Sequence, residues 1–201
     1  MVEIFDYLVQ LFYEHGFNIY MVGGLSRDYL LNLTLKDYDF VSDALPSEIT
    51  KFLDCDDCFI KYGVIKTKVL NKKIEIVTLR KESDYIDHRH PSKIEFIKDI
   101  NIDYLRRDFT INALYIDKNY NVIDPSKLGI VDLKNRFLRF IGDPLTRIKE
   151  DPLRILRAYR FIKKYNLTTS NETLKLLKEN EYLLNELNKE KIKEEIRKES
   201  L

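Results

Sequence analysis

The spacing of hydrophobic residues predicts a helix at the start of the chain and short strands after it. Ile4, Leu8, Leu11 and Phe12 recur at helical intervals within residues 1–15, so one face of this segment is apolar. The next apolar runs are short and bounded by polar turn residues, which is typical of strands. Strands are predicted at Asn18–Val22, Tyr38–Ser42, Phe59–Leu70, Lys73–Arg80, Lys93–Ile97 and Tyr120–Asp124, with the third and fourth joined as a hairpin through Asn71.

Helical patterns between and after these runs predict a strand-rich first part and a helical second part. Short helices are predicted at Ser26–Asn32, Pro46–Leu53 and Asn101–Leu114, and everything from about Ser126 onward is predicted to be helical, including Ile148–Tyr165, 171–187 and 189–200. Arg80–Pro91 is polar and has no period, which predicts a mobile loop. Strands followed by helices indicate an α+β head with a helical extension.

Composition limits the class of protein but does not identify a ligand. The chain has 201 residues, of which 44% are hydrophobic and 33% charged, as expected for one globular domain with or without a helical appendage. The net charge is only +1, so any basic surface for nucleic acid must be local. No apolar run approaches membrane-spanning length, and the acidic residues near the start argue against a signal peptide. We therefore expect a cytoplasmic protein without a membrane partner.

The two cysteines, Cys55 and Cys58, form a single C-x-x-C pair. A structural zinc ion needs four ligands, and the sequence has no second pair. The three histidines, His15, His88 and His90, show no ligand spacing to the pair. We interpret the cysteines as incidental thiols.

The first stretch that indicates chemistry is a glycine pair before a helix. Gly23 and Gly24 allow the backbone to approach a ligand closely, and the helix after them offers unpaired N–H groups and a positive dipole end. Arg27, expected in the first helical turn, can add a charge-assisted contact to the same anion. The pattern predicts a phosphate site, although a glycine pair alone is more often an ordinary turn.

Acidic residues follow this stretch at a spacing that suits metal ions. Asp37 and Asp39 are two residues apart, so in a strand they point to the same face. Two carboxylates beside a phosphate cradle are what a pair of Mg²⁺ ions needs for phosphoryl transfer. Glu75 lies between Ile74 and Ile76 and could bring a third carboxylate to the site, with a solvent-facing side chain as the equal alternative.

The second stretch, Asp103–Leu114, carries groups that can hold a sugar. Asp108 and Asn112 are four residues apart, on one face of the predicted helix. A carboxylate and an amide side by side can bind ribose hydroxyls, and Arg107 can contact phosphate or sugar. A surface ion pair is the ordinary alternative.

The third stretch, Gly142–Phe161, carries a pair that can recognise a base. Asp151 and Arg154 are three residues apart; the carboxylate only accepts hydrogen bonds and the guanidinium only donates them. Cytosine and adenine present an amino donor beside a ring-nitrogen acceptor, whereas uracil and guanine present the reverse. The pair therefore accepts C and A and rejects U and G. Arg157 and Arg160 continue at three-residue steps toward phosphates, although a salt-bridged helix is the plain alternative.

The three stretches, in this order, resemble the class II tRNA nucleotidyltransferases, which are the bacterial and eukaryotic CCA-adding enzymes, and their poly(A) polymerase relatives. The resemblance rests on GGLSRDYLL…DYDF, RRDFTINAL and EDPLRILRAYRF, with support from IVTLR at 76–80, the loop at Tyr85–Pro91 and LNKEKIKEEIRKE near the end. The loop is similar to the flexible element that family members use when they add the terminal A.

This resemblance implies a role for each candidate residue. Asp37 and Asp39 would be the catalytic metal ligands of a two-Mg²⁺ site, with Glu75 as an open third ligand. Asp151 and Arg154 would form the base template, and Asp108 would bind the ribose. The remaining nucleotide contacts would come from Gly23, Gly24, Arg27, Arg107, Asn112, Arg157 and Arg160.

The resemblance also implies a polymerase-beta-like sheet in a head domain, residues 1–140, and an all-helical neck, residues 141–201. Relatives continue into body and tail domains that hold tRNA, which are absent from these residues. The chain is expected to be either a fragment or a minimal enzyme, and a homo-oligomer is left open.

The resulting hypothesis is template-independent addition of C and A from CTP and ATP to the 3′ end of tRNA, with release of pyrophosphate. An A-adding or poly(A) polymerase-type enzyme is the close alternative. A nucleotidyltransferase with a small-molecule or protein acceptor, and a catalytically idle RNA-binding module, are the more distant ones.

Overall fold

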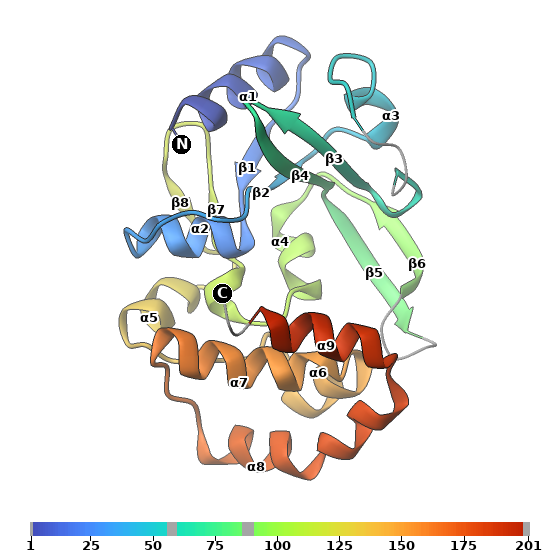
Figure 1. Cartoon of the computed structure of the whole chain (residues 1–201). Coiled ribbons are helices and arrows are strands. Elements are labelled where there is room, and N and C mark those ends of the chain that lie inside the picture. Colours follow the sequence, from blue (N-terminus) through green and yellow to red (C-terminus); the bar gives the residue numbers. More distant parts are fainter. Residues whose placement is uncertain (1, 56–59, 86–90, 199–201) are drawn as a thin grey trace.

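A computed structural model describes residues 2–55, 60–85 and 91–198, and it shows a mixed sheet above a set of helices (Figure 1). The six strands lie in the order β3-β4-β2-β1-β7-β8. Their bounds along the chain are β1 Ile19–Met21, β2 Asp39–Ser42, β3 Val64–Val69, β4 Lys72–Thr78, β7 Tyr115–Ile116 and β8 Val122–Ile123. Strands β2 and β4 are parallel, and the other neighbours are antiparallel. A separate hairpin consists of β5 Arg80–Tyr85 and β6 Pro91–Phe96.

Helices lie before, between and after the strands. In the head they are α1 Val2–Glu14, α2 Gly23–Leu30, α3 Pro46–Ile49, α4 Ile100–Asp103 and α5 Gly129–Lys134. The later helices are α6 Pro144–Glu150, α7 Leu153–Tyr165, α8 Asn171–Glu179 and α9 Lys189–Arg197. Short 3₁₀ turns lie at Ile60–Tyr62, Tyr104–Arg106, Thr110–Asn112 and Glu181–Glu186. The α+β class is confirmed, while the domain boundary at residue 140 stays a prediction.

The strand periodicity divides the head core between the two faces of the sheet. Helix α1 buries Phe5, Leu8 and Phe12 against one face, together with Phe40 and Ile76. A second cluster, formed by Val22, Val41, Leu79 and Tyr115, covers the opposite face. Because side chains alternate along a strand, Asp39 shares the face of Val41 and Glu75 shares the face of Val77, which also packs on this second cluster.

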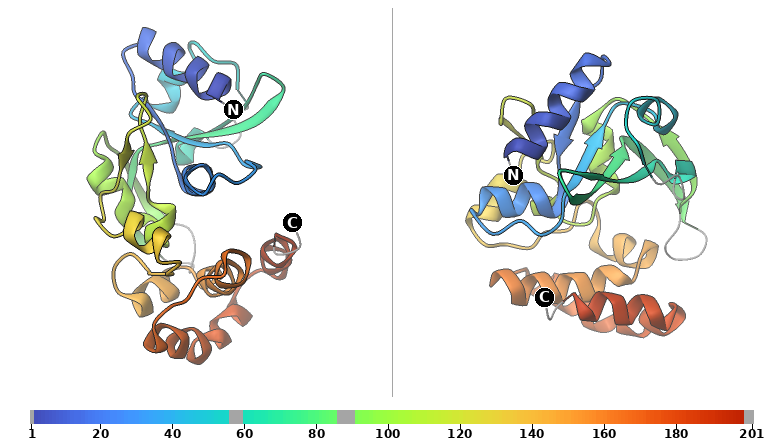
Figure 2. Two further views of the ribbon diagram at one scale, coloured as in Figure 1. Left: turned by 90° about the vertical axis from the view of Figure 1, so that its left-hand side faces the viewer. Right: turned by 45° about the horizontal axis from the view of Figure 1, so that its top comes forward.

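A third cluster unites the end of the head with the helical part. Phe109, Phe140, Ile155 and Phe161 are buried together there, along with residues of α8. In the side view of Figure 2 the head and the helical part join on one side, and α2 and α9 lie toward the opposite side. None of the described helices is long and apolar enough to cross a membrane.

The predicted helix Asn101–Leu114 is wrong. The chain instead forms α4 and a 3₁₀ turn, extends through Arg107 and Phe109, and makes a second 3₁₀ turn. The extended part pairs with a later segment: Thr110 N donates to Arg139 O at 3.0 Å and Ile141 N donates to Asp108 O at 3.0 Å. Tertiary hydrogen bonds override the local helical preference here. Strand β7, which follows, was not predicted.

Two other predictions fail in part. Arg80–Tyr85, expected in a mobile loop, forms strand β5 because its backbone pairs with β6; residues 86–90 lie outside the described residues. The predicted helix Ile148–Tyr165 is interrupted at Asp151, whose backbone is extended. Pro152 explains the interruption, since proline disfavours the helical conformation in the residue before it.

The helical part is also not continuous from Ser126 onward. Phe137 and Phe140 form β-bridges with Thr168 and Phe109, so the segment between α5 and α6 is extended. The predicted helix at 171–187 ends at Glu179 and continues as a 3₁₀ turn.

The cysteine pair has no described metal environment. Cys55 packs against the first head cluster, and Cys58, His88 and His90 lie outside the described residues. His15 stacks on Phe52 with ring centroids 4.1 Å apart. The interpretation of incidental thiols stays a prediction.

The β3–β4 turn gives a testable consequence. Leu70 and Asn71 both have positive φ, 47° and 62°, the backbone of a type I′ turn. Replacing them with Leu70→Asn and Asn71→Gly should raise the free energy of unfolding by about 1 kcal/mol, because these residues adopt positive φ at lower cost. Urea denaturation measures this change. Leu70 is 59% exposed, so little packing is lost, and a lower stability would contradict the turn assignment.

Candidate active site

The parallel pairing of β2 and β4 places two candidate carboxylates side by side. Asp39 is the register partner of Glu75, and Glu75 N donates to Tyr38 O at 2.9 Å. The start of α2 lies next to Asp39: Gly23 has φ +66°, and a Cβ added there would lie 3.6 Å from Asp39 Oδ2. Glu75 therefore lies beside Asp39 in the sheet, while its role as a third metal ligand stays a prediction.

Electrostatic repulsion acts on Asp39. Burial, followed by the charges of Glu75 and Asp37, raises the pKa of Asp39 to about 6, while Arg107 and Lys198 act in the opposite direction. Carboxylates raise one another's pKa when they share a site, and a bound cation relieves that repulsion. Asp39 and the four residues whose charges act on it come from four separate parts of the sequence.

These carboxylates fit Mg²⁺ as partial rather than complete ligands. Among the described residues, no three His, Cys, Asp or Glu side chains form a ready-made cation cluster. Asp37 is exposed and precedes β2, and Glu75 forms a half-exposed ion pair of 3.7 Å with Lys66. Mg²⁺ is usually held by one or two carboxylates together with substrate phosphates, so this donor set suits an ion that arrives with a nucleotide. The metal assignment stays a prediction.

The raised pKa of Asp39 predicts how the chain responds to Mg²⁺. Near pH 8 the carboxylate is ionised and Mg²⁺ should raise the melting temperature; near pH 5 protons compete and the rise should be much smaller. Asp39→Asn should remove the response. It should also raise the melting temperature without Mg²⁺ near pH 8, because it removes a repelled charge.

The matched control for this thermal-shift experiment is Glu179→Gln, on the exposed side of α8, which should behave as the parent chain. An equal Mg²⁺ response at both pH values, or one retained by Asp39→Asn, would contradict the metal assignment.

Arg27 lies deeper than its predicted position. Helix α2 begins at Gly23, so Arg27 is one turn further along than expected and is only 4% exposed. Its guanidinium donates to Asp28 Oδ1 at 2.8 Å, to Asn112 Oδ1 at 2.6 Å and to the Tyr165 hydroxyl. It also lies 4.2 Å from the ring centroid of Tyr165. The expectation of a first-turn Arg27 is therefore wrong, and the side chain joins α2 to α7; its phosphate contact stays a prediction.

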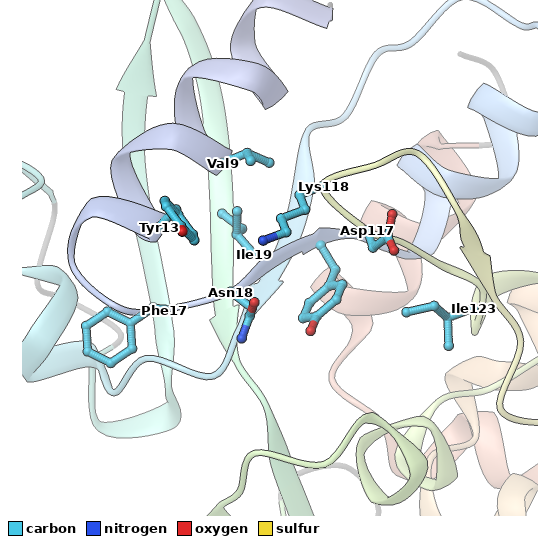
Figure 3. A pocket seen from close by; sticks show the side chains of 9 residues that line it. Val9, Tyr13, Phe17, Asn18, Ile19, Asp117, Lys118 and Ile123 are labelled. Carbon is cyan, nitrogen blue, oxygen red and sulfur yellow. The ribbon is translucent and has the colours of Figure 1, made fainter.

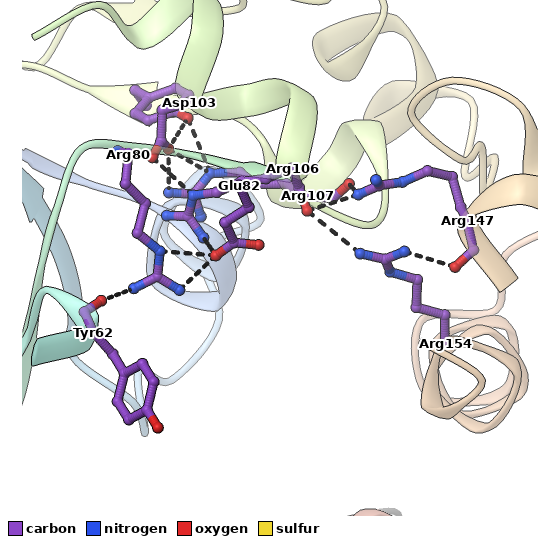
Figure 4. Close-up of polar contacts among 9 residues, drawn as sticks. Tyr62, Arg80, Glu82, Asp103, Arg106, Arg107, Arg147 and Arg154 are labelled. Atoms are coloured by element: carbon purple, nitrogen blue, oxygen red, sulfur yellow. Dashed lines mark hydrogen bonds and ion pairs between the residues drawn. The ribbon is translucent and has the colours of Figure 1, made fainter. Parts of the chain in front are cut away.

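A buried carboxylate that was not predicted from the sequence organises residues 106–109, called here the RRDF segment. Asp103, fully buried, accepts from Arg80 N at 3.0 Å, Arg106 Nε at 2.9 Å, Arg107 Nη2 at 2.8 Å and the Tyr115 hydroxyl at 2.7 Å (Figure 4). The available signal was an acidic residue three and four positions before two arginines, the spacing of helical ion pairs.

The same cluster reaches the β5–β6 hairpin. Glu82 Oε1 accepts from Arg80 Nε at 2.8 Å and lies 3.6 Å from Arg106 Nη1 (Figure 4). Arg80 also donates to the Tyr62 carbonyl. Ion pairs thus connect the start of the β5–β6 hairpin to the segment that contains Arg106 and Arg107.

Asp103 should contribute strongly to stability. Burial alone would raise its pKa, but Arg107, Arg106, the Arg80 N–H and Tyr115 hold the pKa of Asp103 well below its usual range. Its stabilising contribution is therefore present above the unfolded pKa of about 3.9 and is lost only as pH falls toward the folded value. Asp103→Asn should cost about 3–5 kcal/mol near neutral pH, because a fully buried carboxylate is replaced and two mostly buried arginines lose their partner.

Urea unfolding tests this expectation, with the exposed Glu190→Gln as control. The deficit of Asp103→Asn relative to the parent chain should shrink below about pH 4. A variant as stable as the parent near neutral pH would show that the arginines find other partners.

The two candidate ribose-binding residues, Asp108 and Asn112, lie close together although the predicted helix Asn101–Leu114 is not formed. Asn112 Nδ2 donates to Asp108 Oδ1 at 3.2 Å, and Arg157 Nη2 lies 2.6 Å from Asp108 Oδ2. Burial opposes ionisation, but Arg157, Asn112 and the Phe109 N–H lower the pKa of Asp108. The charge of Asp39 also acts on Arg157, which places the ribose candidates within electrostatic range of the carboxylates.

Arg154, Arg157 and Arg160 of α7 each pair with a different carboxylate, namely Glu150, Asp108 and Glu195. Arg154, 5% exposed, donates to Glu150 Oε2 at 2.9 Å and to the Arg147 carbonyl at 2.6 Å. Arg160 Nη2 lies 2.6 Å from Glu195 Oε1 on α9. Asp151 Oδ1 accepts from Leu153 N at 3.1 Å at the start of α7. The base and phosphate roles of these residues stay predictions.

A pocket of about 150 Å³ lies elsewhere, between α1, the start of β1 and the β7–β8 turn (Figure 3). Val9, Tyr13 and Ile19 line one part, and Asp117 and Lys118 line another. It contains none of the predicted site residues.

Comparison with known proteins decides the family. A family model described as the poly A polymerase head domain matches residues 19–139. The chain belongs to this family. The CCA-adding enzyme of Staphylococcus haemolyticus is 38% identical over 186 residues, which cover 92% of this chain and 46% of that relative. The chain thus spans about half the length of the curated relatives that it matches.

Solved structures agree with the family assignment. The Bacillus stearothermophilus CCA-adding enzyme in complex with CTP superposes with a TM-score of 0.87 at 28% identity, covering 98% of this chain and 48% of that one. A tRNA nucleotidyltransferase complexed with a primer tRNA and an incoming ATP analogue gives a TM-score of 0.74 at 32% identity, covering 98% and 55%. The family resemblance and the fold predicted from sequence are both confirmed.

Proposed function

We propose that this poly A polymerase head-domain family member adds C and A, without a nucleic-acid template, to the 3′ end of tRNA. The substrates are CTP and ATP, and pyrophosphate is released. The similarity to CCA-adding enzymes over most of this chain supports the activity and its bacterial class II type. The tRNA partner rests on the relative described with a primer tRNA. A cytoplasmic location stays a prediction.

The observation that carries the proposal is the meeting of the three sequence stretches around Asp39. Glu75 is its register partner, Gly23 approaches its carboxylate, and the charges of Arg107 and Arg157 interact with it. Carboxylates for a metal, a glycine turn for phosphate and arginines for a triphosphate are the parts that nucleotidyl transfer needs.

In the proposed reaction the 3′-hydroxyl oxygen of tRNA attacks the α-phosphorus of the nucleotide. The new P–O bond forms as the bond to pyrophosphate breaks, and the hydroxyl proton leaves to solvent. Asp37 and Asp39, with Glu75 as a further candidate, would hold Mg²⁺, which supplies the acidification of the hydroxyl and neutralises the leaving group. Arg107 and Arg157 would orient the nucleotide, and Asp108 and Asn112 would hold its ribose.

Base choice would come from Asp151 and Arg154. The carboxylate accepts the amino group of cytosine or adenine, and the guanidinium donates to the neighbouring ring nitrogen. Uracil or guanine would leave both protein groups without partners.

In the test, the chain is incubated with Mg²⁺ and a tRNA that lacks its CCA end. Each labelled nucleotide is supplied alone, then CTP and ATP together, and the nucleotides added to the tRNA are measured. The chain should add C and A but not U or G. Asp151→Ala should raise use of UTP relative to CTP on the order of tenfold or more, because the acceptor that rejects uracil is gone. Asp39→Ala provides the inactive reference, and Glu179→Gln provides the matched surface control.

Unchanged base selectivity in an active Asp151→Ala chain would contradict the template assignment. Addition of A alone would instead support the A-adding or poly(A)-type activity of the same scaffold.

A further inference from the structure

Arg147 is a buried arginine that connects two of the three functional stretches. Its side chain is 9% exposed and lies on α6. Nη2 donates to the carbonyls of Arg106 and Arg107 at 2.7 and 2.9 Å (Figure 4). Nη1 donates to Glu150. One guanidinium thus spans the backbone of the RRDF segment and the acidic residue that precedes Asp151.

Arg154 shares these partners. Its Nη1 donates to the Arg147 carbonyl at 2.6 Å, and its Nη2 lies 3.5 Å from the Arg106 carbonyl (Figure 4). Nη1 also donates to Glu150 Oε2 at 2.9 Å. Both arginines therefore contact the same carboxylate and the same backbone carbonyl. The orientation of Arg154 depends on where Arg147 holds Glu150 and Arg106.

The shared contacts use one edge of the Arg154 guanidinium. Its five N–H groups form an end edge, Nη1 with Nη2, and a side edge, Nε with Nη2. The described contacts use the Nη1 and Nη2 nitrogens, and Nε has no hydrogen-bond acceptor among the residues that the structure describes. The side edge is thus the one that can donate to adjacent acceptors of a base, such as the ring nitrogen and carbonyl of cytosine.

We propose that Arg147, acting through Glu150 and the Arg106 carbonyl, is the positioning residue that sets base selection by Arg154. This inference rests on the proposed function, since it requires Arg154 to contact the base. Without the Arg147 guanidinium, the Arg107 carbonyl loses this donor, the Arg106 carbonyl keeps only the 3.5 Å contact from Arg154, and Glu150 keeps one arginine partner. Arg154 then turns its side edge toward those acceptors, and selectivity falls.

The test compares Arg147→Gln and Arg147→Lys with the parent chain. Equilibrium binding of CTP and UTP in Mg²⁺ gives the preference directly, and single-nucleotide transfer gives kcat and KM for each. Arg147→Gln should reduce the CTP-to-UTP preference about tenfold, mostly through KM. Arg147→Lys can donate to one carbonyl and should restore part of it.

The matched control is Arg139→Gln. Arg139 also forms two hydrogen bonds to a carboxylate, that of Asp132, at 2.9 and 3.1 Å, but it contacts neither Glu150 nor the Arg106 carbonyl. This variant should keep the parent preference. Measurements well below the melting temperature of each variant separate positioning from folding.

A parent-like preference in Arg147→Gln, or an equal loss in Arg139→Gln, would overturn the inference while leaving the proposed function intact. A parent chain that neither binds CTP in preference to UTP nor transfers it would remove the proposed function, and the inference with it. A lost preference with partial rescue by lysine supports the positioning role.

Discussion

The buried carboxylate of Asp103 is the constraint on which the proposed site depends. Two arginines and a tyrosine hydroxyl donate to it, and it also fixes the backbone at Arg80. A buried charge without partners is costly, so the segment from Asp103 to Arg107 is held in one conformation. The carbonyls that this conformation presents are those that Arg147 contacts. One ion cluster therefore supports both the Arg107 side chain and the backbone carbonyls to which Arg147 of α6 donates.

The candidate site lies where β2, β4, α7 and the RRDF segment come together, although they are far apart in the sequence. The parallel pairing of β2 and β4 places Glu75 beside Asp39, and the ion pair between Arg157 and Asp108 joins α7 to the RRDF segment. Arg27 adds a second connection between head and helices through Asn112 and Tyr165. Charges that repel one another at the carboxylates are thus held within reach of arginines, an arrangement suited to a metal-bound triphosphate.

Much of the fold and the identity of the candidate residues could be predicted from the sequence, because hydrophobic periodicity and local motifs carry that information. The strand positions of Asp39 and Glu75 followed from the alternation around them. The failures have tertiary causes: the helix at 101–114 yields to backbone pairing with 139–141, and β5 exists only because β6 pairs with it. Asp103 was missed although two of its partners are three and four residues away. The contacts of Arg147 and the buried position of Arg27 were missed because their partners are distant in sequence.

The most direct test of the account is a crystal structure of the chain with Mg²⁺ and a non-hydrolysable CTP analogue. The account predicts the pairing edge of cytosine against Asp151 and the Nε–Nη2 edge of Arg154, with the phosphates between the Gly23–Gly24 turn and Asp37 and Asp39. A base bound away from α7, or phosphates remote from those aspartates, would contradict it.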